Sequence, residues 1–238
     1  VPNMLNRRQL IQLGATMAAI PSLPLSAADA SRSGTISRLI PSSGEAIPVV
    51  GMGTSRTFDV GDSPADIARL QAVMQAFLNG GGTVIDSSPM YGKAERRVGD
   101  VLRLLDTRPP IFAATKVWTY GEEKGVAQMQ ASAQRMDISQ FGLIAVHNLR
   151  DWQVHLKTLR RHKEEGRVRH IGITTSNGRN HPELLEIMRR EPLDFVQFSY
   201  NIVDRAAEKS LLPLAQERGI ATMINRPFQR GELFSRTR

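Results

Sequence analysis

The feature that most constrains this chain is the alternation of short apolar runs with amphipathic stretches along residues 49–225. In the amphipathic stretches, apolar residues recur three and four positions apart, which is typical of helices. Strands that alternate with helices form parallel β-α-β units with right-handed crossovers. The predicted strands are Val49–Thr54, Thr83–Ser88, Ile111–Trp118, Phe141–His147, His170–Thr175, Phe195–Asn201 and Ala221–Asn225. The predicted helices are Asp66–Leu78, Arg96–Leu105, Trp152–Glu165, Pro182–Arg190 and Ala206–Arg218.

These elements indicate one α/β domain, because no linker rich in Pro or Ser divides residues 36–238. Before the first strand, Ile36–Ile40 and Glu45–Val50 flank a turn sequence and predict a hairpin. A dinucleotide-binding Rossmann unit would carry Gly-x-Gly-x-x-Gly after its first strand, but Gly51–Arg56 lacks the third glycine. Successive strand candidates without that motif favour a (β/α)₈ TIM barrel over an open sheet.

The N-terminal segment predicts an export signal. Arg7 and Arg8 precede a mostly apolar run that ends in small residues at 26–30. A charged start, an apolar core and a small-x-small ending are the parts of such a signal, and the paired arginines resemble a twin-arginine signal. We therefore expect a signal peptide over residues 1–30, a barrel domain over 31–238, and a periplasmic location reached through the export machinery. An amphipathic arm on a cytoplasmic protein is the alternative, and two prolines in the run argue against a membrane-spanning helix.

Composition excludes several kinds of chemistry. The chain has no cysteine, which excludes disulfides, cysteine-ligated metals and a cysteine nucleophile. The net charge of +8 is compatible with nucleic acids or with anionic ligands. Basic residues gather at 160–163 and 167–169, but Glu164 and Glu165 stand between them. This pattern favours a solvated helix end, and we expect neither a nucleic-acid partner nor a metal.

Polar residues stand where the predicted strands end, which is where the active site of such a barrel lies. They are Asp86, Tyr91 in the following loop, Lys116, His147, Ser176-Asn177, Gln197 and Asn225-Arg226. A half-buried Lys116 needs a carboxylate partner, and Asp86 on the neighbouring strand is the candidate. The ammonium favours the phenolate of a nearby tyrosine, which suits Tyr91 to exchange a proton with a carbonyl or alcohol oxygen. A neutral His147 can orient that oxygen by a hydrogen bond.

The set Asp86, Tyr91-Gly92, Lys116 and His147 resembles the catalytic tetrad of the aldo-keto reductases, in order and on the expected strands. The resemblance extends from about Val49 to Phe234 and includes Val50–Thr54, Glu165–Gly172, Val196–Asn201 and Arg226–Gly231. It implies a barrel that binds NADP(H) in an extended form, with NAD(H) left open, and a small-molecule carbonyl substrate. It also implies hydride transfer between the nicotinamide and the carbonyl carbon.

The same resemblance implies a role for each matching position. Tyr91 would be the general acid and base, Lys116 would act on it, Asp86 would pair with the lysine, and His147 would position the substrate oxygen. Ser176, Asn177 and Gln197 would hold the nicotinamide carboxamide, whose groups both donate and accept hydrogen bonds. The full set of expected cofactor-binding residues is Gly53, Thr54, Asp86, Ser176, Asn177, Gln197, Asn225, Arg226 and Pro227.

The sequence departs from the family pattern in two places. The seventh strand ends in Asn225-Arg226-Pro227, without the aromatic ring that stacks on the nicotinamide in many relatives. After Phe234 we expect the barrel to be cut short before an eighth strand, where relatives hold the 2′-phosphate of NADP. Three hypotheses stay open: an NADPH-dependent reductase of an aldehyde or ketone, a nucleotide-binding or sensing protein with little catalysis, and a truncated remnant without function. The sequence indicates neither the particular carbonyl nor an oligomeric state.

Overall fold

A computed structural model of the chain describes residues 35–105, 109–176, 178 and 180–236. The predicted signal peptide at 1–30 and the expected cofactor residue Asn177 lie outside the described residues. Across the described ranges, no helix has both the length and the apolar character that crossing a bilayer requires.

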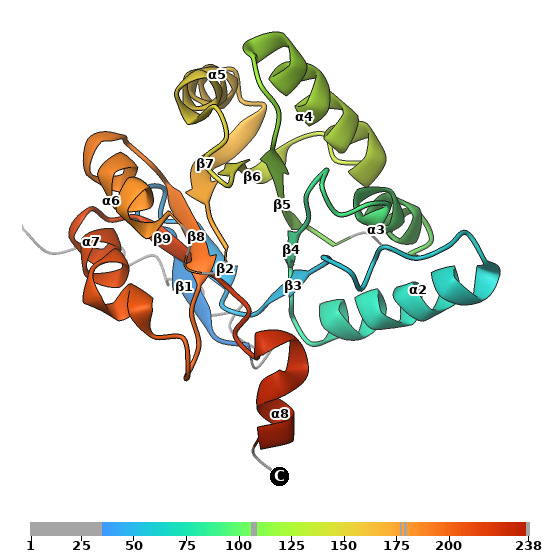
Figure 1. Cartoon of the computed structure of the whole chain (residues 1–238). Coiled ribbons are helices and arrows are strands. Elements are labelled where there is room, and N and C mark those ends of the chain that lie inside the picture. Colours follow the sequence, from blue (N-terminus) through green and yellow to red (C-terminus); the bar gives the residue numbers. More distant parts are fainter. Residues whose placement is uncertain (1–34, 106–108, 177, 179, 237–238) are drawn as a thin grey trace, which may run out of the picture. The chain divides into compact units, whose positions relative to one another are not determined.

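Seven parallel strands form one sheet, in which spatial order follows chain order from β3 to β9. The strands are β3 (Gly51–Gly53), β4 (Val84–Asp86), β5 (Phe112–Val117), β6 (Phe141–His147), β7 (Val168–Thr174), β8 (Phe195–Ser199) and β9 (Ala221–Asn225). The sheet curls, and the helices cover its outer face (Figure 1). The predicted barrel-type α/β architecture is therefore confirmed, with β3 and β9 as the two edges of the sheet within the described residues.

The helices follow the predicted positions, and two of them, the third and the last of those given next, were not predicted. They are α2 (Pro64–Asn79), α3 (Ala94–Arg103), α4 (Glu122–Met136), α5 (Trp152–Glu164), α6 (His181–Arg190), α7 (Leu211–Glu217) and α8 (Glu232–Arg236), with short 3₁₀ turns η1 (Ala206–Lys209) and η2 (Gln229–Gly231). The sequence did not predict α4, because its buried face includes Gly125 and Ser132 as well as Met129 and Met136. Small and polar residues on the buried face weaken the apolar period that marks a helix.

The observed bounds lie within two residues of the predicted ones, and one predicted helix is divided. The first strand covers only Gly51–Gly53, shorter than the apolar run around it. The helix predicted over Ala206–Arg218 is divided into η1 and α7, because Ser210 between them has φ −152° and ψ −41°. Pro213, in the first turn of α7, fits this restart because a proline has no N–H to donate to a preceding turn.

The predicted hairpin is present and packs at the amino ends of the sheet strands. β1 (Ser37–Leu39) pairs antiparallel with β2 (Ala46–Pro48). In the turn, Ser43 Oγ lies 2.9 Å from Nε2 of the buried His170 on β7. Ile40 and Ile47 pack against apolar side chains inside the curl, which are Val84, Phe112, Ala114, Leu143 and Phe195.

Alternation along the strands explains where polar groups collect. On β5, Phe112 and Ala114 belong to the cluster inside the curl, whereas Thr115 points outward and bonds to Glu95 of α3. Successive side chains of a strand face opposite sides, so Lys116 lies on the inner face, beyond Ala114. The same count places polar residues on the inner face of four further strands, at the carboxyl end of β4, β6 and β9 and at the centre of β8. With Lys116, this polar layer consists of Asp86, His147, Gln197 and Asn225.

Candidate active site

Lys116 and Asp86 form the buried centre of the polar layer. The Lys116 side chain is 1% exposed, and its Nζ donates to Asp86 Oδ1 at 2.8 Å, to Oδ2 at 2.9 Å and to the Ser87 carbonyl at 2.7 Å. Burial acts to lower the pKa of Lys116, but the charge of Asp86 and the interaction with Tyr91 outweigh it and raise the pKa above its ordinary value. The ammonium therefore stays charged at neutral pH, and Asp86 is the carboxylate partner that the sequence predicted for it.

Tyr91 lies directly beside this ion pair. Its ring centroid is 5.2 Å from Lys116 Nζ, and the interaction with Tyr91 contributes to the raised pKa of the lysine. The loop that carries Tyr91 is tightly built, because Gly92 has φ +56° and a Cβ there would lie 2.3 Å from the Asp59 carboxylate. The Asp59 carboxylate also accepts from Lys93 N at 2.9 Å. The backbone on the C-terminal side of Tyr91 is thus held in one conformation.

His147 completes the group as a neutral imidazole. Burial first, and then the charges of Lys116 and Arg150, lower its pKa from 6.5 to about 3. Its ring lies edge-on to that of Tyr91, with centroids 6.1 Å apart. Nδ1 lies 3.1 Å from the hydroxyl of buried Ser88, and this hydroxyl also accepts from Met90 N at 3.2 Å. The predicted tetrad is therefore brought together, with Ser88 holding the imidazole from behind.

Two of the expected cofactor residues contact Asp86 directly. Gln197 Nε2 donates to Asp86 Oδ2 at 3.1 Å. Thr54 is fully buried, and its hydroxyl donates to the Asp86 carbonyl at 3.0 Å and lies 2.9 Å from Ser87 Oγ. In this structure Thr54 braces the backbone around Asp86, while the neighbouring Gly53 is exposed, with open space where a Cβ would stand.

The other expected cofactor residues line the ends of β7 and β9. Asn225 Nδ2 donates to the Thr175 carbonyl at 3.3 Å, which ties the two strand ends together across β8. Ser176 follows Thr175 and is partly buried, whereas Pro227 is exposed. The Thr175 hydroxyl is buried without a hydrogen-bond partner among the described residues. An unsatisfied buried hydroxyl is costly, so it marks a place where a ligand's amide group would be stabilised.

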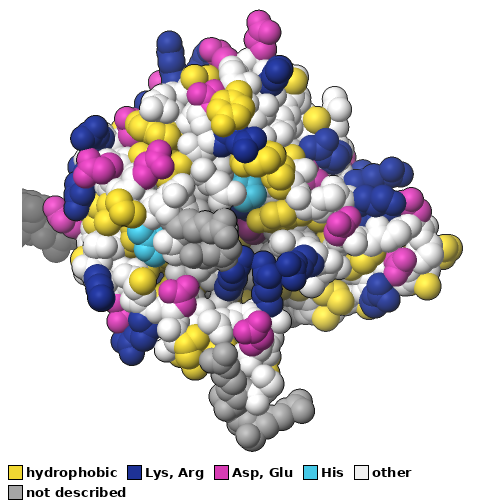
Figure 2. All heavy atoms as spheres, in the orientation of Figure 1, with side chains coloured by type: hydrophobic (Ala, Val, Ile, Leu, Met, Phe, Trp, Pro, Cys, Tyr) yellow, Lys and Arg dark blue, Asp and Glu magenta, His cyan; other side chains and the backbone are white. Residues whose placement is uncertain are grey.

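A basic cluster stands beside the polar layer. It consists of Arg56, Arg226 and Arg230, and all three have φ between 56° and 69°. Burial first, and then repulsion from Arg230 and Arg56, lower the pKa of Arg226. None of the three forms an ion pair with a described carboxylate, and on the face seen in Figure 2 basic side chains gather near the centre beside a histidine. Gathered guanidinium groups suit the diphosphate of a dinucleotide, so the residues present fit such a cofactor.

Four contributors were missed by the sequence reasoning. Ser88 and Thr175 are small hydroxyl residues next to predicted site positions, and only the fold shows that one contacts His147 and the other lacks a partner. Arg56 and Arg230 stand in the loops after β3 and β9, and the signal that could have found them is their place just beyond predicted strand ends.

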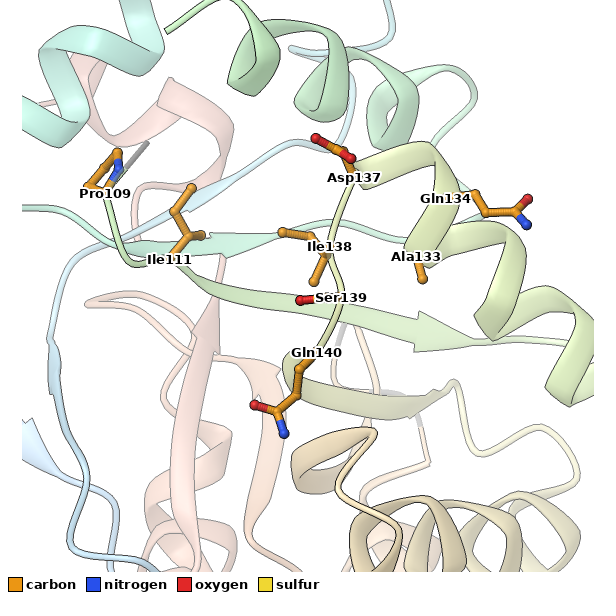
Figure 3. A pocket seen from close by; sticks show the side chains of 8 residues that line it. All are labelled: Pro109, Ile111, Ala133, Gln134, Asp137, Ile138, Ser139 and Gln140. Carbon is orange, nitrogen blue, oxygen red and sulfur yellow. The ribbon is translucent and has the colours of Figure 1, made fainter. Parts of the chain in front are cut away.

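A separate hollow lies away from this chemistry. It is lined by the residues labelled in Figure 3, which include Pro109, Ile111, Ser139 and Gln140. Ile111 precedes β5 and Gln140 precedes β6, so the hollow is at the amino ends of these strands. The tetrad lies at or beyond the carboxyl ends, so this hollow does not open onto the site.

The family model described as the aldo/keto reductase family matches residues 49–238, and the chain belongs to this family. Among curated relatives, it is 27% identical over 222 residues to the NADH-specific methylglyoxal reductase of Escherichia coli K12, covering 77% of this chain and 64% of that protein. Among solved structures, the thermostable aldo-keto reductase Tm1743 superposes with a TM-score of 0.72 at 23% identity, covering 85% of this chain and 78% of that one. An aldo/keto reductase from Klebsiella pneumoniae in complex with NADP and acetate gives 0.66 at 25% identity, with 80% and 68% covered.

Proposed function

We propose that the chain is an NADP(H)-dependent oxidoreductase that reduces an aldehyde or ketone to an alcohol, with Tyr91 as the proton donor. One observation carries the proposal: a buried ammonium, Lys116, is bonded to Asp86 and lies 5.2 Å from the Tyr91 ring centroid, beside a neutral His147. Family membership supports it, as do the relative named as a methylglyoxal reductase and the related structure in complex with NADP.

The chain's own residues act on the carbonyl oxygen. Tyr91 donates its hydroxyl proton to that oxygen while a C–H bond forms at the carbonyl carbon, so the product is an alcohol. The Lys116 ammonium stabilises the phenolate that remains, and Asp86 holds the ammonium in place. The phenolate then recovers a proton from solvent.

His147 has a supporting role that its contacts define. Met90 N–H donates to the Ser88 hydroxyl, which leaves the hydroxyl proton free to point at His147 Nδ1. With Nδ1 as acceptor, the neutral ring carries its proton on Nε2 and can donate it to the substrate oxygen. A cationic imidazole would instead compete with Tyr91 as an acid, and the low pKa of His147 prevents this at neutral pH.

The cofactor would lie along the ends of β7, β8 and β9. Gln197, Ser176 and the Thr175 hydroxyl offer polar atoms to a nicotinamide carboxamide, and Asn225 fixes the spacing between two of these strand ends. The basic cluster would hold the diphosphate. When bound, a reduced nicotinamide dinucleotide supplies the hydride that forms the new C–H bond.

The test replaces Tyr91 with phenylalanine, which keeps the ring and removes only the proton. Reduction of methylglyoxal and of a panel of neutral aldehydes by NADPH should fall by about 10²- to 10⁴-fold in kcat. Affinity for NADPH, followed by fluorescence, should stay within about twofold, because Tyr91 is not among the residues assigned to the cofactor.

Tyr200→Phe is the matched control, since its hydroxyl bonds to Glu208 at 2.7 Å, outside the tetrad. It should keep wild-type turnover. Equal turnover of Tyr91→Phe and wild type would contradict the proposal. Tight NADPH binding by the wild type without turnover of any carbonyl would instead support a nucleotide-binding or sensing protein.

A further inference from the structure

Arg150 lies just beyond the carboxyl end of β6, in an environment that the tetrad does not explain. It follows His147 by three residues, and its guanidinium carbon lies 3.5 Å from the ring centroid of Trp118 and 5.0 Å from that of Tyr120. Trp118 follows Lys116 by two residues and stands just past the end of β5 at Val117. The guanidinium and these two rings therefore form a wall directly beyond Lys116 and His147.

Hydrogen bonds from α4, from α5 and from the residue before α5 hold the backbone of the loop that carries the two rings. Gln128 of α4 accepts from Trp118 N at 2.6 Å and donates to its carbonyl at 3.3 Å. His155 Nε2 of α5 lies 2.9 Å from the Thr119 carbonyl. The Asp151 carboxylate accepts from Gly121 N at 2.7 Å. The backbone that carries the two rings is thus held on both sides of Tyr120.

The segment that carries Arg150 is strained. Asn148, Leu149 and Asp151 have φ of 50°, 55° and 51°, although none of them is glycine. Asparagine tolerates this region, but a left-handed leucine is unfavourable, and it persists here with its side chain buried. Such strain concentrates at functional sites, and here it places Arg150 over the rings.

Arg150 has no anionic partner within the described part of the chain. The nearest carboxylate in sequence, Asp151, is bonded to Gly121 N instead. Glu122, at the start of α4, pairs with Arg161 at 2.7 Å. A guanidinium stacked on aromatic rings keeps its N–H edge available, and that edge matches the two oxygens of a carboxylate or phosphate.

We propose that Arg150, supported by Trp118 and Tyr120, selects carbonyl substrates that also carry an anionic group. The inference rests on the proposed carbonyl reduction and deepens it by naming a substrate class. The anion would bond to the guanidinium while the carbonyl oxygen lies between Tyr91 and His147. Binding energy at a non-reacting group of the substrate then orients the reacting carbonyl.

The test compares substrates that differ only in the charged group. The pairs are succinic semialdehyde against butanal, and glyceraldehyde 3-phosphate against glyceraldehyde. For each pair, the readout is the ratio of kcat/KM for the charged member to kcat/KM for the neutral one. In the wild type, at least one pair should give a ratio above about 10. The pair that gives this ratio shows whether Arg150 prefers a carboxylate or a phosphate.

Arg150→Met keeps most of the length of the side chain and removes its charge. It should lower the favoured ratio by about 10- to 100-fold, mainly through KM of the charged substrate. Arg189→Met, an exposed residue of α6 paired with Glu186, removes the same charge elsewhere and should leave the ratio unchanged. Thermal unfolding of both variants checks that each is folded.

Two failures are distinguishable. If the wild type reduces neither member of either pair, the proposed carbonyl reduction fails with these substrates, and the inference fails with it. If neutral aldehydes are reduced but both ratios are near one, or Arg150→Met leaves the favoured ratio unchanged, the selection by Arg150 is overturned while the carbonyl reduction stands.

Discussion

At the scale of single residues, the site depends on keeping one group charged and its neighbour neutral. Lys116 and His147 are both largely buried, yet their pKa values move in opposite directions, because only Lys116 has a carboxylate partner. The sequence could predict this pairing, since Asp86 and Lys116 end neighbouring strands. It could not predict Ser88, because a serine two residues after a strand end has no pattern that distinguishes it from any other loop serine.

The depressed pKa of His147 predicts a measurable effect of pH on stability. The folded chain holds this imidazole neutral down to about pH 3, whereas the ordinary value in the unfolded chain is 6.5. Between these values the unfolded chain binds more protons, so the free energy of unfolding rises with pH. The contribution is complete above about pH 6.5 and is lost as the pH falls, by about 1 kcal/mol per pH unit.

Urea unfolding at several values from pH 4.5 to 7.5 measures this slope. His147→Asn should have a slope smaller by about 1 kcal/mol per pH unit, since asparagine does not titrate. His162, whose pKa is lowered first by burial, contributes in the same direction and is retained in both proteins, so it cancels in the comparison. Parallel slopes for the two proteins would contradict a neutral, buried His147.

At the scale of elements, alternation made the strands and their order predictable, but contacts between helices were not. The strand ends fell close to their predicted places because a parallel β-α-β chain repeats one simple pattern. The helix α4 was not predicted, because its buried face carries small and polar residues where it packs closely against α3. At that contact Glu95 is buried and is bonded to Thr115, Ser132 and Arg135, which links α3, β5 and α4.

Gly99 of α3 gives a direct test of this contact. A Cβ at this position would lie 2.1 Å from the backbone oxygen of Arg135 on α4. Gly99→Ala should therefore force the two helices apart and lower the free energy of unfolding by about 2 kcal/mol. Gly80→Ala is the control, because its φ is −75° and its nearest contact would be at 3.4 Å. Urea unfolding that finds Gly99→Ala as stable as Gly80→Ala would disprove the close packing.

At the scale of the whole molecule, the distribution of charge matters more than its sum. The basic residues of segment 160–169 are largely neutralised, as Arg161 pairs with Glu122, Lys163 with Asp194 and Arg167 with Glu165. The basic cluster has no such ion pairs among the described residues. Composition gives only the total positive charge. The structure shows that the unpaired part of it includes the basic cluster at the carboxyl end of the sheet, beside the tetrad.

This distribution predicts how the folded chain responds to a dinucleotide. NADPH that binds only the folded state should raise its stability by about 2.7 kcal/mol at 100 times Kd, which thermal unfolding would measure as an increase in Tm. Arg230→Met should weaken binding by about tenfold, because one guanidinium contact to the diphosphate is lost. Raising NaCl from about 50 to 500 mM should weaken wild-type binding more than that of the variant, since screening acts on the contact that the variant lacks.

Arg190→Met provides the matched control, because this residue of α6 is exposed and pairs with Glu186, away from the strand ends. It should bind NADPH as the wild type does, with the same dependence on salt. NADH titrated in parallel carries the same diphosphate without the 2′-phosphate, so Arg230→Met should weaken both dinucleotides by a similar factor. A loss confined to NADPH would assign Arg230 to the 2′-phosphate instead, and equal binding by Arg230→Met and wild type would remove the basic cluster from the cofactor site.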